Sequence, residues 1–352
     1  NGGGCMISSI KNVRIAGVSC VVPTKSKSLY DEPNLYDGNQ KKIKRIVESS
    51  GFLNRRIADE NVTTSDLCYK AALDLLENCP VEKSDIDAIL FVSYTPDYFM
   101  PATSYVLHNK LGLNENCICM DIPQGCSGYE VGLYQAGMLI NNGCKKVLLL
   151  VGDTFSKFSD MFINKTAPVF GDAGTATLIE YSENVAPWYF SFHTDSSGYD
   201  ALICENGAFR NPVRRSDFYE EGAFEYKAKM DGARVFDFTM KRIQPSIMEI
   251  LKNNGISKDD IDYFVLHQAN KMILQNIALA LEIPLEKMPI GTMTEYGNQC
   301  GASIPCTFSK FLKKDFSSKK SRVLLSGFGV GLSWANCILD IDNIYVSELI
   351  EY

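Results

Sequence analysis

The stretch DIPQGCSGYEVGLY, residues 121–134, sets Cys126 between a Pro-Gln-Gly turn and a Ser-Gly step. An apolar run typical of a buried strand ends just before it, and a run with helical spacing begins just after it. Gly125, Ser127 and Gly128 give the sulfur small neighbours. A cysteine that only fills a core needs no such neighbours, whereas one that a substrate must approach does. The stretch therefore predicts a strand, a turn that carries a reactive thiol, and a helix whose N-terminus lowers the pKa of that thiol.

Strand-like and helix-like runs alternate along the rest of the chain. The apolar pattern predicts strands over 87–93, 117–122, 146–152, 174–181, 262–270, 321–331 and 333–341. Helical spacing over 127–143 and 271–283 predicts helices behind two of these strands. Strands separated by helices imply right-handed crossovers and buried, mostly parallel sheets.

The pattern of strand, polar loop and helix around Cys126 recurs around His267. This echo predicts two similar α/β halves that face each other, with residues 6–185 carrying the cysteine and residues 186–352 carrying the histidine. The stretch 191–235 is richer in Gly, Arg and aromatic residues, and we expect it to be an insertion or lid.

Composition excludes several classes of protein. The formal net charge of −7 and the lack of a polybasic tail argue against a nucleic-acid binder. The longest unbroken apolar runs, 147–151 among them, are too short to cross a bilayer, and the first residues lack a secretory signal pattern. The twelve cysteines lie mostly in apolar segments without a C-x-x-C pair. We therefore expect reduced thiols and a cytoplasmic protein.

Histidines are scarce, since the chain has only three. His267, in LHQAN, lies where a predicted strand ends, which is the position at which open α/β sheets place their sites. His108 falls inside a predicted helix, and we expect His108 and His193 to be structural.

Two further stretches combine glycine with polar residues. In EYGNQCGASIP, residues 295–305, the pair Gly297-Asn298 is a turn signal, and Asn298 alone would be an ordinary turn residue. In GFGVGLSWA, residues 327–335, glycines let the backbone approach a ligand. The latter lacks the register of a dinucleotide-binding loop, so that function is excluded.

Together, GCSG, HQAN, GNQCGASIP and GFGVGLSW resemble the motifs of β-ketoacyl-acyl carrier protein synthase III, a member of the thiolase superfamily. The stretches 170–180 and 230–236 resemble two others of that family, and the matches keep the family's order through most of the chain. Thiolases proper carry a second catalytic cysteine where this chain has GFGVGLS, and elongating synthases carry a second histidine where it has Asn298. The resemblance implies a thiolase-like α/β fold with a layered αβαβα core.

The resemblance also implies a two-stage mechanism. Cys126 takes an acyl group from a thioester donor, and malonyl on an acyl carrier protein then loses CO₂ and condenses with it. Backbone N–H groups of Cys126 and Val330 form the oxyanion hole, while His267 and Asn298 stabilise the enolate. No metal and no redox cofactor is expected. The alternative is an acyltransferase on the same scaffold that passes the acyl group to an amine or alcohol. A non-catalytic dimeric relative is disfavoured by the intact Cys-His-Asn set.

By the same resemblance the protein is a homodimer in which Met100, with Phe99 beside it, closes the acyl pocket of the partner. Phe236 is expected to line that pocket as well. Arg45, Lys165 and Lys271 are expected to contact an acyl-CoA donor or an acidic carrier protein, and no nucleic-acid or membrane partner is expected.

The chain departs from the family where an adenine would bind. Arg45 and Ser49 stand where the family has a Trp and an Arg, and Asn164-Lys165 replaces an Arg-Gly pair. We therefore expect poor use of acetyl-CoA and a preference for another acyl donor, such as one on a carrier protein.

Overall fold

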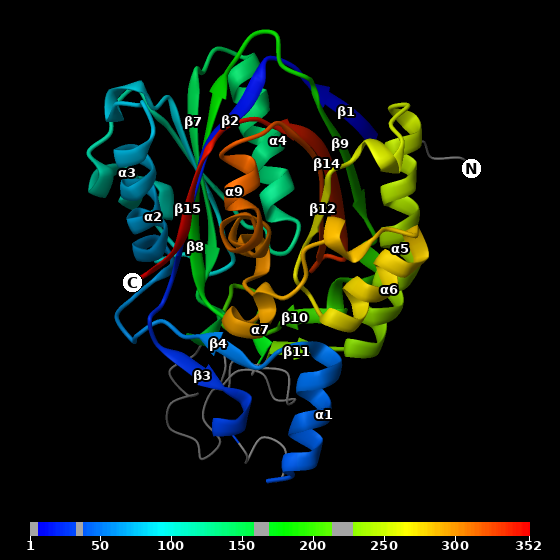
Figure 1. The fold of residues 1–352 in the computed structure, drawn as a ribbon. Helices are drawn as coiled ribbons and strands as arrows, with labels where there is room; N and C mark the ends of the chain where they lie inside the picture. Colours follow the sequence, from blue (N-terminus) through cyan, green and yellow to red (C-terminus); the bar gives the residue numbers. More distant parts are fainter. Residues whose placement is uncertain (1–5, 33–37, 158–168, 213–227) are drawn as a thin grey trace.

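The computed structural model describes residues 6–32, 38–157, 169–212 and 228–352, and it stacks helices and sheets in alternating layers (Figure 1). The first sheet has the strand order β15–β2–β8–β7–β5–β6. Its strands are β2 (Val13–Val22), β5 (Ala88–Val92), β6 (Ile118–Ile122), β7 (Lys146–Asp153), β8 (Ala173–Tyr181) and β15 (Tyr345–Glu351). Strand β5 runs parallel to both β6 and β7, as the alternation of strands and helices predicted.

The second sheet has the order β1–β9–β14–β13–β12. Its strands are β1 (Met6–Ile10), β9 (Trp188–Thr194), β12 (Tyr263–Leu266), β13 (Ser321–Gly329) and β14 (Ser333–Ile341). Strands β13 and β14 form a hairpin, and β12 runs parallel to β13. The turn of this hairpin lies at one end of the sheet and contains Val330, the predicted oxyanion donor.

The two sheets exchange strands at the ends of the chain. β1, from the N-terminal region, pairs with β9 in the second sheet, while β15, from the C-terminal region, pairs with β2 in the first. Each half is therefore completed by the other half's terminal strand. The division of the chain at residues 185 and 186 stays a prediction.

Helices cover both outer faces and fill the space between the sheets (Figure 1). The outer helices are α2 (Thr64–Asn78) and α3 (Thr103–Leu111) on the first sheet, and α5 (Gly232–Asn253) and α6 (Lys271–Leu281) on the second. The central layer holds α4 (Gly128–Asn141), α8 (Ser303–Thr307) and α9 (Lys313–Phe316). This arrangement confirms the layered αβαβα core. No helix in the described part of the chain is long and apolar enough to span a membrane.

Shorter elements gather below the layers in Figure 1, at the end of the molecule where the site lies. They are β3 (Ser26–Ser28), α1 (Gln40–Ser50), β4 (Asn54–Arg56), β10 (Leu202–Cys204), β11 (Ala228–Met230) and α7 (Thr292–Tyr296). Strands β10 and β11 pair with each other inside the stretch expected to be an insertion.

Apolar side chains separate the layers. Tyr129 and Leu133 of α4 are fully buried between the two sheets, as are Phe308 and Phe316 on the neighbouring helical segments. Both faces of the central helices are thus covered by sheet, which explains why the sequence of α4 is apolar around most of its circumference.

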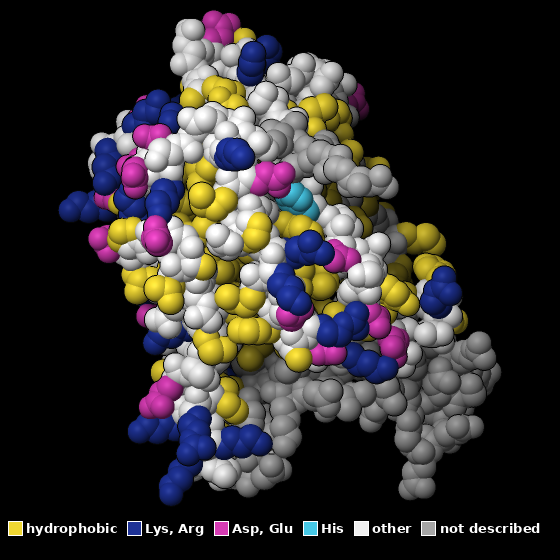
Figure 2. Space-filling view, turned by 90° about the vertical axis from the view of Figure 1, so that its right-hand side faces the viewer, with side chains coloured by type: hydrophobic (Ala, Val, Ile, Leu, Met, Phe, Trp, Pro, Cys, Tyr) yellow, Lys and Arg dark blue, Asp and Glu magenta, His cyan; other side chains and the backbone are white. Residues whose placement is uncertain are grey.

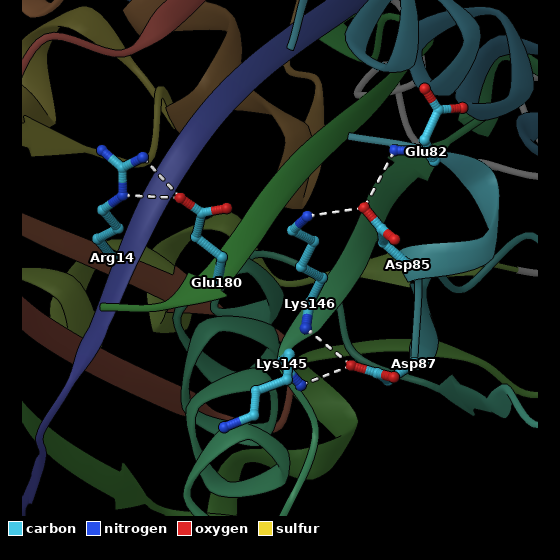
Figure 3. Close-up of polar contacts among 7 residues, drawn as sticks. All are labelled: Arg14, Glu82, Asp85, Asp87, Lys145, Lys146 and Glu180. Carbon is cyan, nitrogen blue, oxygen red and sulfur yellow. Dashed lines mark hydrogen bonds and ion pairs between the residues drawn. The ribbon is translucent and has the colours of Figure 1, made fainter. Parts of the chain in front are cut away.

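Polar contacts fix the strand register at the end of the first sheet away from the site (Figure 3). The Arg14 guanidinium donates to Oε1 of Glu180 at 2.8 and 2.6 Å, which ties β2 to β8. Oδ2 of Asp87, just before β5, accepts the backbone N–H groups of Lys145 and Lys146 at 2.5 and 3.0 Å. This clamp aligns the starts of the parallel strands β5 and β7, so their carboxyl ends also meet at one level.

The packing of α2 on the first sheet depends on Gly174. A Cβ added there would lie 2.5 Å from the backbone nitrogen of Cys68 and 2.5 Å from Cβ of Leu67. Because the helix backbone cannot move aside, we predict that Gly174→Ala lowers the free energy of unfolding by about 1–3 kcal/mol. Gly232→Ala is the matched control, since nothing lies within 4 Å of its added Cβ. Urea midpoints at one protein concentration test this, and equal midpoints would contradict it.

Candidate active site

Cys126 lies in the turn between β6 and α4, as the sequence predicted. The turn closes through a 2.7 Å hydrogen bond from the N–H of Gly128 to the carbonyl of Gly125, and α4 begins at Gly128. The side chain is only 7% exposed. The sulfur therefore sits at a helix N-terminus in a nearly dry place, where the helix dipole favours a thiolate and burial opposes it.

Glycines of the β13–β14 hairpin make room for this thiol. A Cβ added at Gly329 would lie 2.6 Å from Sγ of Cys126, and one added at Gly327 would lie 2.6 Å from its carbonyl oxygen. The hairpin backbone consequently reaches the sulfur directly, and the N–H of Val330 donates to it. The glycines thus allow a close approach of the backbone to the Cys126 side chain, while the predicted approach to a ligand stays a prediction.

His267 follows β12 and is buried. Its backbone N–H donates to the carbonyl of Ser326 at 2.9 Å, which anchors it to β13. Its Nδ1 lies 2.8 Å from Oγ of Ser303 on α8. With Nδ1 engaged in this way, Nε2 is the ring nitrogen left for the reaction.

Asn298 is held by both its backbone and its side chain. Its N–H donates to the carbonyl of Val169 at 2.6 Å, and its carbonyl accepts the N–H of Gly171 at 3.1 Å. Oδ1 accepts the N–H of Cys300 at 2.9 Å. The side-chain oxygen is therefore occupied, and Nδ2 is the group of this amide that can donate to a substrate.

The remaining polar residues of HQAN are structural. Nε2 of Gln268 donates to the carbonyls of Leu266 and Pro289, while Oδ1 of Asn270 accepts the N–H of Met272 and caps α6. This explains why the predicted strand over 262–270 ends early, at Leu266: the residues after it form a loop and a helix cap.

Cys300 is a site residue that the sequence reasoning missed. Its Sγ lies 3.6 Å from Sγ of Cys126, and its side chain is 2% exposed. Its φ of 51° is in the left-handed region, which is uncommon for a residue with a side chain. The available signal was its place two residues after Asn298 in one motif, but we had grouped Cys300 with the other cysteines of apolar segments.

The environment favours a thiolate at Cys126. A hydrogen bond from Cys300 is the main cause that lowers its pKa; burial opposes this, and the charge and hydrogen bond of His267 and the N–H of Val330 add to it. Together they hold the pKa of Cys126 well below its ordinary value. The same contact and burial raise the pKa of Cys300 well above the ordinary value. The thiolate is thus favoured at Cys126, and Cys300 is its hydrogen-bond donor.

Burial favours the neutral form of two carboxyl groups nearby. Burial raises the pKa of Glu130, in the first turn of α4, to about 8, and that of Asp153, at the end of β7, to about 7. Asp153 accepts hydrogen bonds from the N–H of Tyr94 and the hydroxyl of Ser93. Because a neutral Glu130 places no negative charge beside the sulfur, it is compatible with a thiolate at Cys126.

A cavity of about 410 Å³ ends at the two sulfurs. Its walls are mostly apolar, and its lining residues are Tyr94, Cys126, Phe155, Phe170, Tyr199, Leu202, Ile203, Cys204, Ala228, Cys300 and Val330. Strands β10 and β11 supply part of this wall, so the stretch expected to be an insertion or lid contributes to the site. A space of this shape and polarity suits an acyl chain that reaches the sulfur with its carbonyl end.

Within the single chain, the residues predicted for the acyl pocket do not line the cavity that contains Cys126. Phe99 and Met100 are 82% and 85% exposed and line a second cavity, of about 860 Å³, which shares Tyr94 and Cys204 with the first. Phe236 packs against the apolar cluster beneath α5. The role of Phe99 and Met100 in a partner's pocket stays a prediction, as does the role of Phe236.

The residues predicted for donor or carrier binding are partly brought together. Arg45 on α1 and Lys271, which begins α6, are both exposed, and the Lys271 side chain packs against Gly51 at the end of α1. Lys165 lies outside the described residues. Lysine and arginine side chains project at the lower end in Figure 2, where Figure 1 places α1. The ones on α1 are Lys41, Lys42, Lys44 and Arg45.

Potential metal ligands come together at the other end of β6 from Cys126. Among the described residues, His108, Cys117 and Cys119 have ligand atoms within 4.8 Å of one another. Nε2 of His108 lies 2.9 Å from the carbonyl of Asn114, so that contact already engages one ring nitrogen. None of these residues lies in the cavity that ends at Cys126.

Comparison with protein families finds two matching segments. Residues 120–198 match the model of 3-oxoacyl-[acyl-carrier-protein] synthase III, and residues 251–341 match the C-terminal part of that family. These segments contain Cys126, His267, Asn298 and Val330.

Similar proteins match over nearly the full chain. A putative 3-oxoacyl-[acyl-carrier-protein] synthase 3 of Campylobacter jejuni is 32% identical, covering 99% of each chain. A β-ketoacyl-[acyl-carrier-protein] synthase III of Clostridium tetani is 32% identical, covering 94% of this chain and 98% of its own. The crystal structure of a 3-oxoacyl-(acyl-carrier protein) synthase from Burkholderia xenovorans superposes with a TM-score of 0.91 at 35% identity, covering 99% of each chain.

The contact between the two sulfurs gives a test that needs no substrate. Hydrogen bonds to charged groups are worth ~1.5–3 kcal/mol, or about one to two pKa units. We predict that Cys300→Ala moves the rate of Cys126 alkylation by iodoacetamide to higher pH by about that amount. Cys300→Ser keeps a donor and should stay closer to the wild type. Peptide mass spectrometry across pH isolates Cys126 from the other cysteines, and an unshifted profile for Cys300→Ala would contradict the role of Cys300.

Proposed function

The chain belongs to the 3-oxoacyl-[acyl-carrier-protein] synthase III family, and we propose that it loads an acyl group on Cys126 and condenses it with a malonyl thioester on a carrier protein. It is a thiolase-like, acyl-transferring condensing enzyme of fatty acid biosynthesis. The observation that carries the proposal is the surroundings of the Cys126 sulfur. It is hydrogen-bonded by His267 and lies 3.6 Å from the sulfur of Cys300, whose N–H donates to Asn298.

The first stage forms an acyl-enzyme. The Cys126 thiolate attacks the carbonyl carbon of the donor thioester, the donor's carbon–sulfur bond breaks, and the donor thiol leaves. Negative charge passes through the carbonyl oxygen, where the N–H groups of Cys126 and Val330 stabilise it. The direct approach of the hairpin backbone to the sulfur supports this assignment, because Gly329 lets Val330 come that close.

The second stage forms the carbon–carbon bond. The malonyl thioester loses CO₂, and the electron pair that is released moves onto its thioester oxygen as an enolate. Nε2 of His267 and Nδ2 of Asn298 donate to that oxygen. The Ser303 hydroxyl donates to the carbonyl of Cys300 at 2.8 Å, so Nδ1 of His267 donates to Oγ of Ser303. Nε2 therefore donates when the ring carries both protons. The enolate carbon then attacks the acyl carbonyl, the Cys126 thiolate leaves, and the product is a β-ketoacyl thioester.

The chemistry of each step is supplied by the chain and its thioester substrates. Acyl transfer to an amine or alcohol is the alternative, and it has no enolate to stabilise. Nδ1 of His267 and Oδ1 of Asn298 are already engaged within the protein, which leaves Nε2 and Nδ2 to donate to a substrate. These two donors favour condensation, because they are useful where negative charge develops on an oxygen.

We propose a homodimer joined along β6. In the described part of the first sheet, β6 pairs with β5 alone, so its other edge is open. Ile118 and Met120 on this strand are exposed, as are Tyr98, Phe99 and Met100 in the loop before α3. Open edges and large apolar patches are normally covered by a partner. A second copy paired there would bring Phe99 and Met100 toward its neighbour.

We also propose that an acyl carrier protein binds beside α1, and that the enzyme works in the cytosol. The basic side chains of α1 and the nearby Lys271 suit an acidic partner surface. Free thiols at all described cysteines are compatible with a reducing compartment.

The roles of the three site residues are separable. We predict that Cys126→Ala takes up no acyl group by intact mass, whereas His267→Ala and Asn298→Ala still acylate but release CO₂ from malonyl thioester at least about a hundredfold more slowly, since one lost donor costs ~2.7–4 kcal/mol. Cys144→Ala, which changes a free cysteine outside this cavity, should behave as wild type. Normal CO₂ release by both donor variants would favour the acyltransferase alternative.

The acyl donor follows from the missing adenine contacts. Stacking a base on an aromatic ring is worth ~1–3 kcal/mol, and neither Arg45 nor Ser49 offers such a ring. We predict that Cys126 acylates faster from an acyl carrier protein than from matched acetyl-CoA, with a rate that falls as salt rises. Lys44→Glu should slow only the carrier reaction, while Lys252→Glu, at the far end of α5, should not. Fast acylation by acetyl-CoA that does not depend on salt would overturn the prediction.

A further inference from the structure

We propose that Cys300 is the second half of a redox-sensitive pair, which closes a reversible disulfide with Cys126 when the enzyme meets a peroxide. The proposal rests on the proposed function only in taking Cys126 to be the reactive thiol of the site. Disulfide formation would switch the enzyme off and would keep its nucleophile from irreversible oxidation.

The geometry places the two sulfurs one short movement from a bond. They are 3.6 Å apart, and a disulfide bond is about 2.05 Å long, so they must approach by roughly 1.5 Å. Glycines surround them: a Cβ added at Gly125 would lie 3.3 Å from Sγ of Cys300, and one at Gly329 would lie 2.6 Å from Sγ of Cys126. On these two sides, small adjustments of the cysteine side chains therefore meet glycine hydrogens.

The pair is chemically unequal, which is what a peroxide reaction requires. Cys126 is the thiolate, while Cys300 stays protonated and donates to it. The other titratable groups around Cys126 are His267, Glu130, Asp153 and Tyr94, and burial raises the pKa of both carboxyl groups. The thiolate is thus the sulfur that attacks an oxidant.

The reaction balances with a hydroperoxide as the oxidant. The Cys126 thiolate attacks one peroxide oxygen, the O–O bond breaks, and hydroxide leaves to give a sulfenic acid. The Cys300 sulfur then attacks the sulfenic sulfur, the S–O bond breaks, and the sulfenic oxygen leaves as water with the Cys300 proton. Two electrons pass from the two thiols to the peroxide.

Access distinguishes this pair from another in the same chain. Cys126 and Cys300 both line the cavity of about 410 Å³, so a small peroxide can reach them by the path that serves the substrate. Cys20 and Cys306 also interact through their side chains, but both are completely buried in the layer between the sheets. Cys20 and Cys306 therefore serve as an internal control, because their side chains lie close together but are not accessible to a peroxide.

The test uses the full-length enzyme with graded hydrogen peroxide. Free thiols are then blocked with N-ethylmaleimide, and digestion without reductant is followed by peptide mass spectrometry. We expect a cross-linked peptide that joins residues 126 and 300, loss of condensation activity in the same proportion, and recovery of both with dithiothreitol. No cross-link between Cys20 and Cys306 is expected, and loading Cys126 with an acyl group beforehand should prevent the reaction.

Cys300→Ser and Cys300→Ala are the decisive variants. Without a resolving thiol, the sulfenic acid goes on to sulfinic acid, so we expect a mass gain of two oxygens at Cys126 and no recovery with dithiothreitol. Sulfinic acid in the wild type without a cross-link, or equal recovery of wild type and variants, would overturn the proposal. The cross-link is read by mass alone, so a failure of the condensation assay would count against the proposed function and not against the pair.

Discussion

Keeping a negatively charged sulfur in a nearly dry place is the constraint on which this site depends. Burial alone would leave Cys126 protonated and unreactive. The fold opposes this with donors from different parts of the chain: Cys300 through its thiol, His267 through its ring, and Val330 through its backbone, all set at the N-terminus of α4. Each donor is needed near the sulfur, and a side chain at Gly329 would exclude one of them. The glycine pattern of the last hairpin is thus a consequence of the thiolate.

The layered architecture is what brings those donors to one point. Cys126 enters from the first sheet through the β6–α4 turn, whereas His267, Cys300 and Val330 enter from the second half. A site assembled from two halves loses its geometry if the halves slide. The exchange of β1 and β15 between the sheets resists such sliding, because any displacement would break a strand ladder at each end of the chain. Strand exchange and site precision are therefore linked through the same interface.

The sequence predicted this site well where function depends on local pattern, and poorly where it depends on contacts between distant segments. The turn around Cys126 and the glycines near Val330 are local features that the structure places as predicted, while the strand before His267 ends at Leu266, earlier than the predicted end at residue 270. Cys300 was missed because its importance comes from a neighbour 174 positions away. The exchange of terminal strands was missed for the same reason, since β1 and β15 have ordinary strand sequences. Phe99 and Met100 are exposed in a loop, and the periodicity of apolar residues does not predict the exposure of loop side chains.

The contact that activates Cys126 is also the one that exposes it to oxidation. A thiol donor as close as 3.6 Å stabilises the thiolate, but the same distance lets the pair close a disulfide. A serine at this position would donate as well without offering a second sulfur, so activation alone does not account for a cysteine there. The left-handed backbone at Cys300 also indicates that this position is specifically constrained. A residue with a side chain is held in that conformation only where the surrounding contacts fix it. Those contacts include the hydrogen bond from its N–H to Oδ1 of Asn298, which also orients the amide that is the second donor in the proposed condensation. A change in the position of Cys300 therefore affects Cys126 through the contact between the sulfurs and Asn298 through the backbone. In the proposed mechanism, this one residue links both stages of the reaction to the redox state of the site.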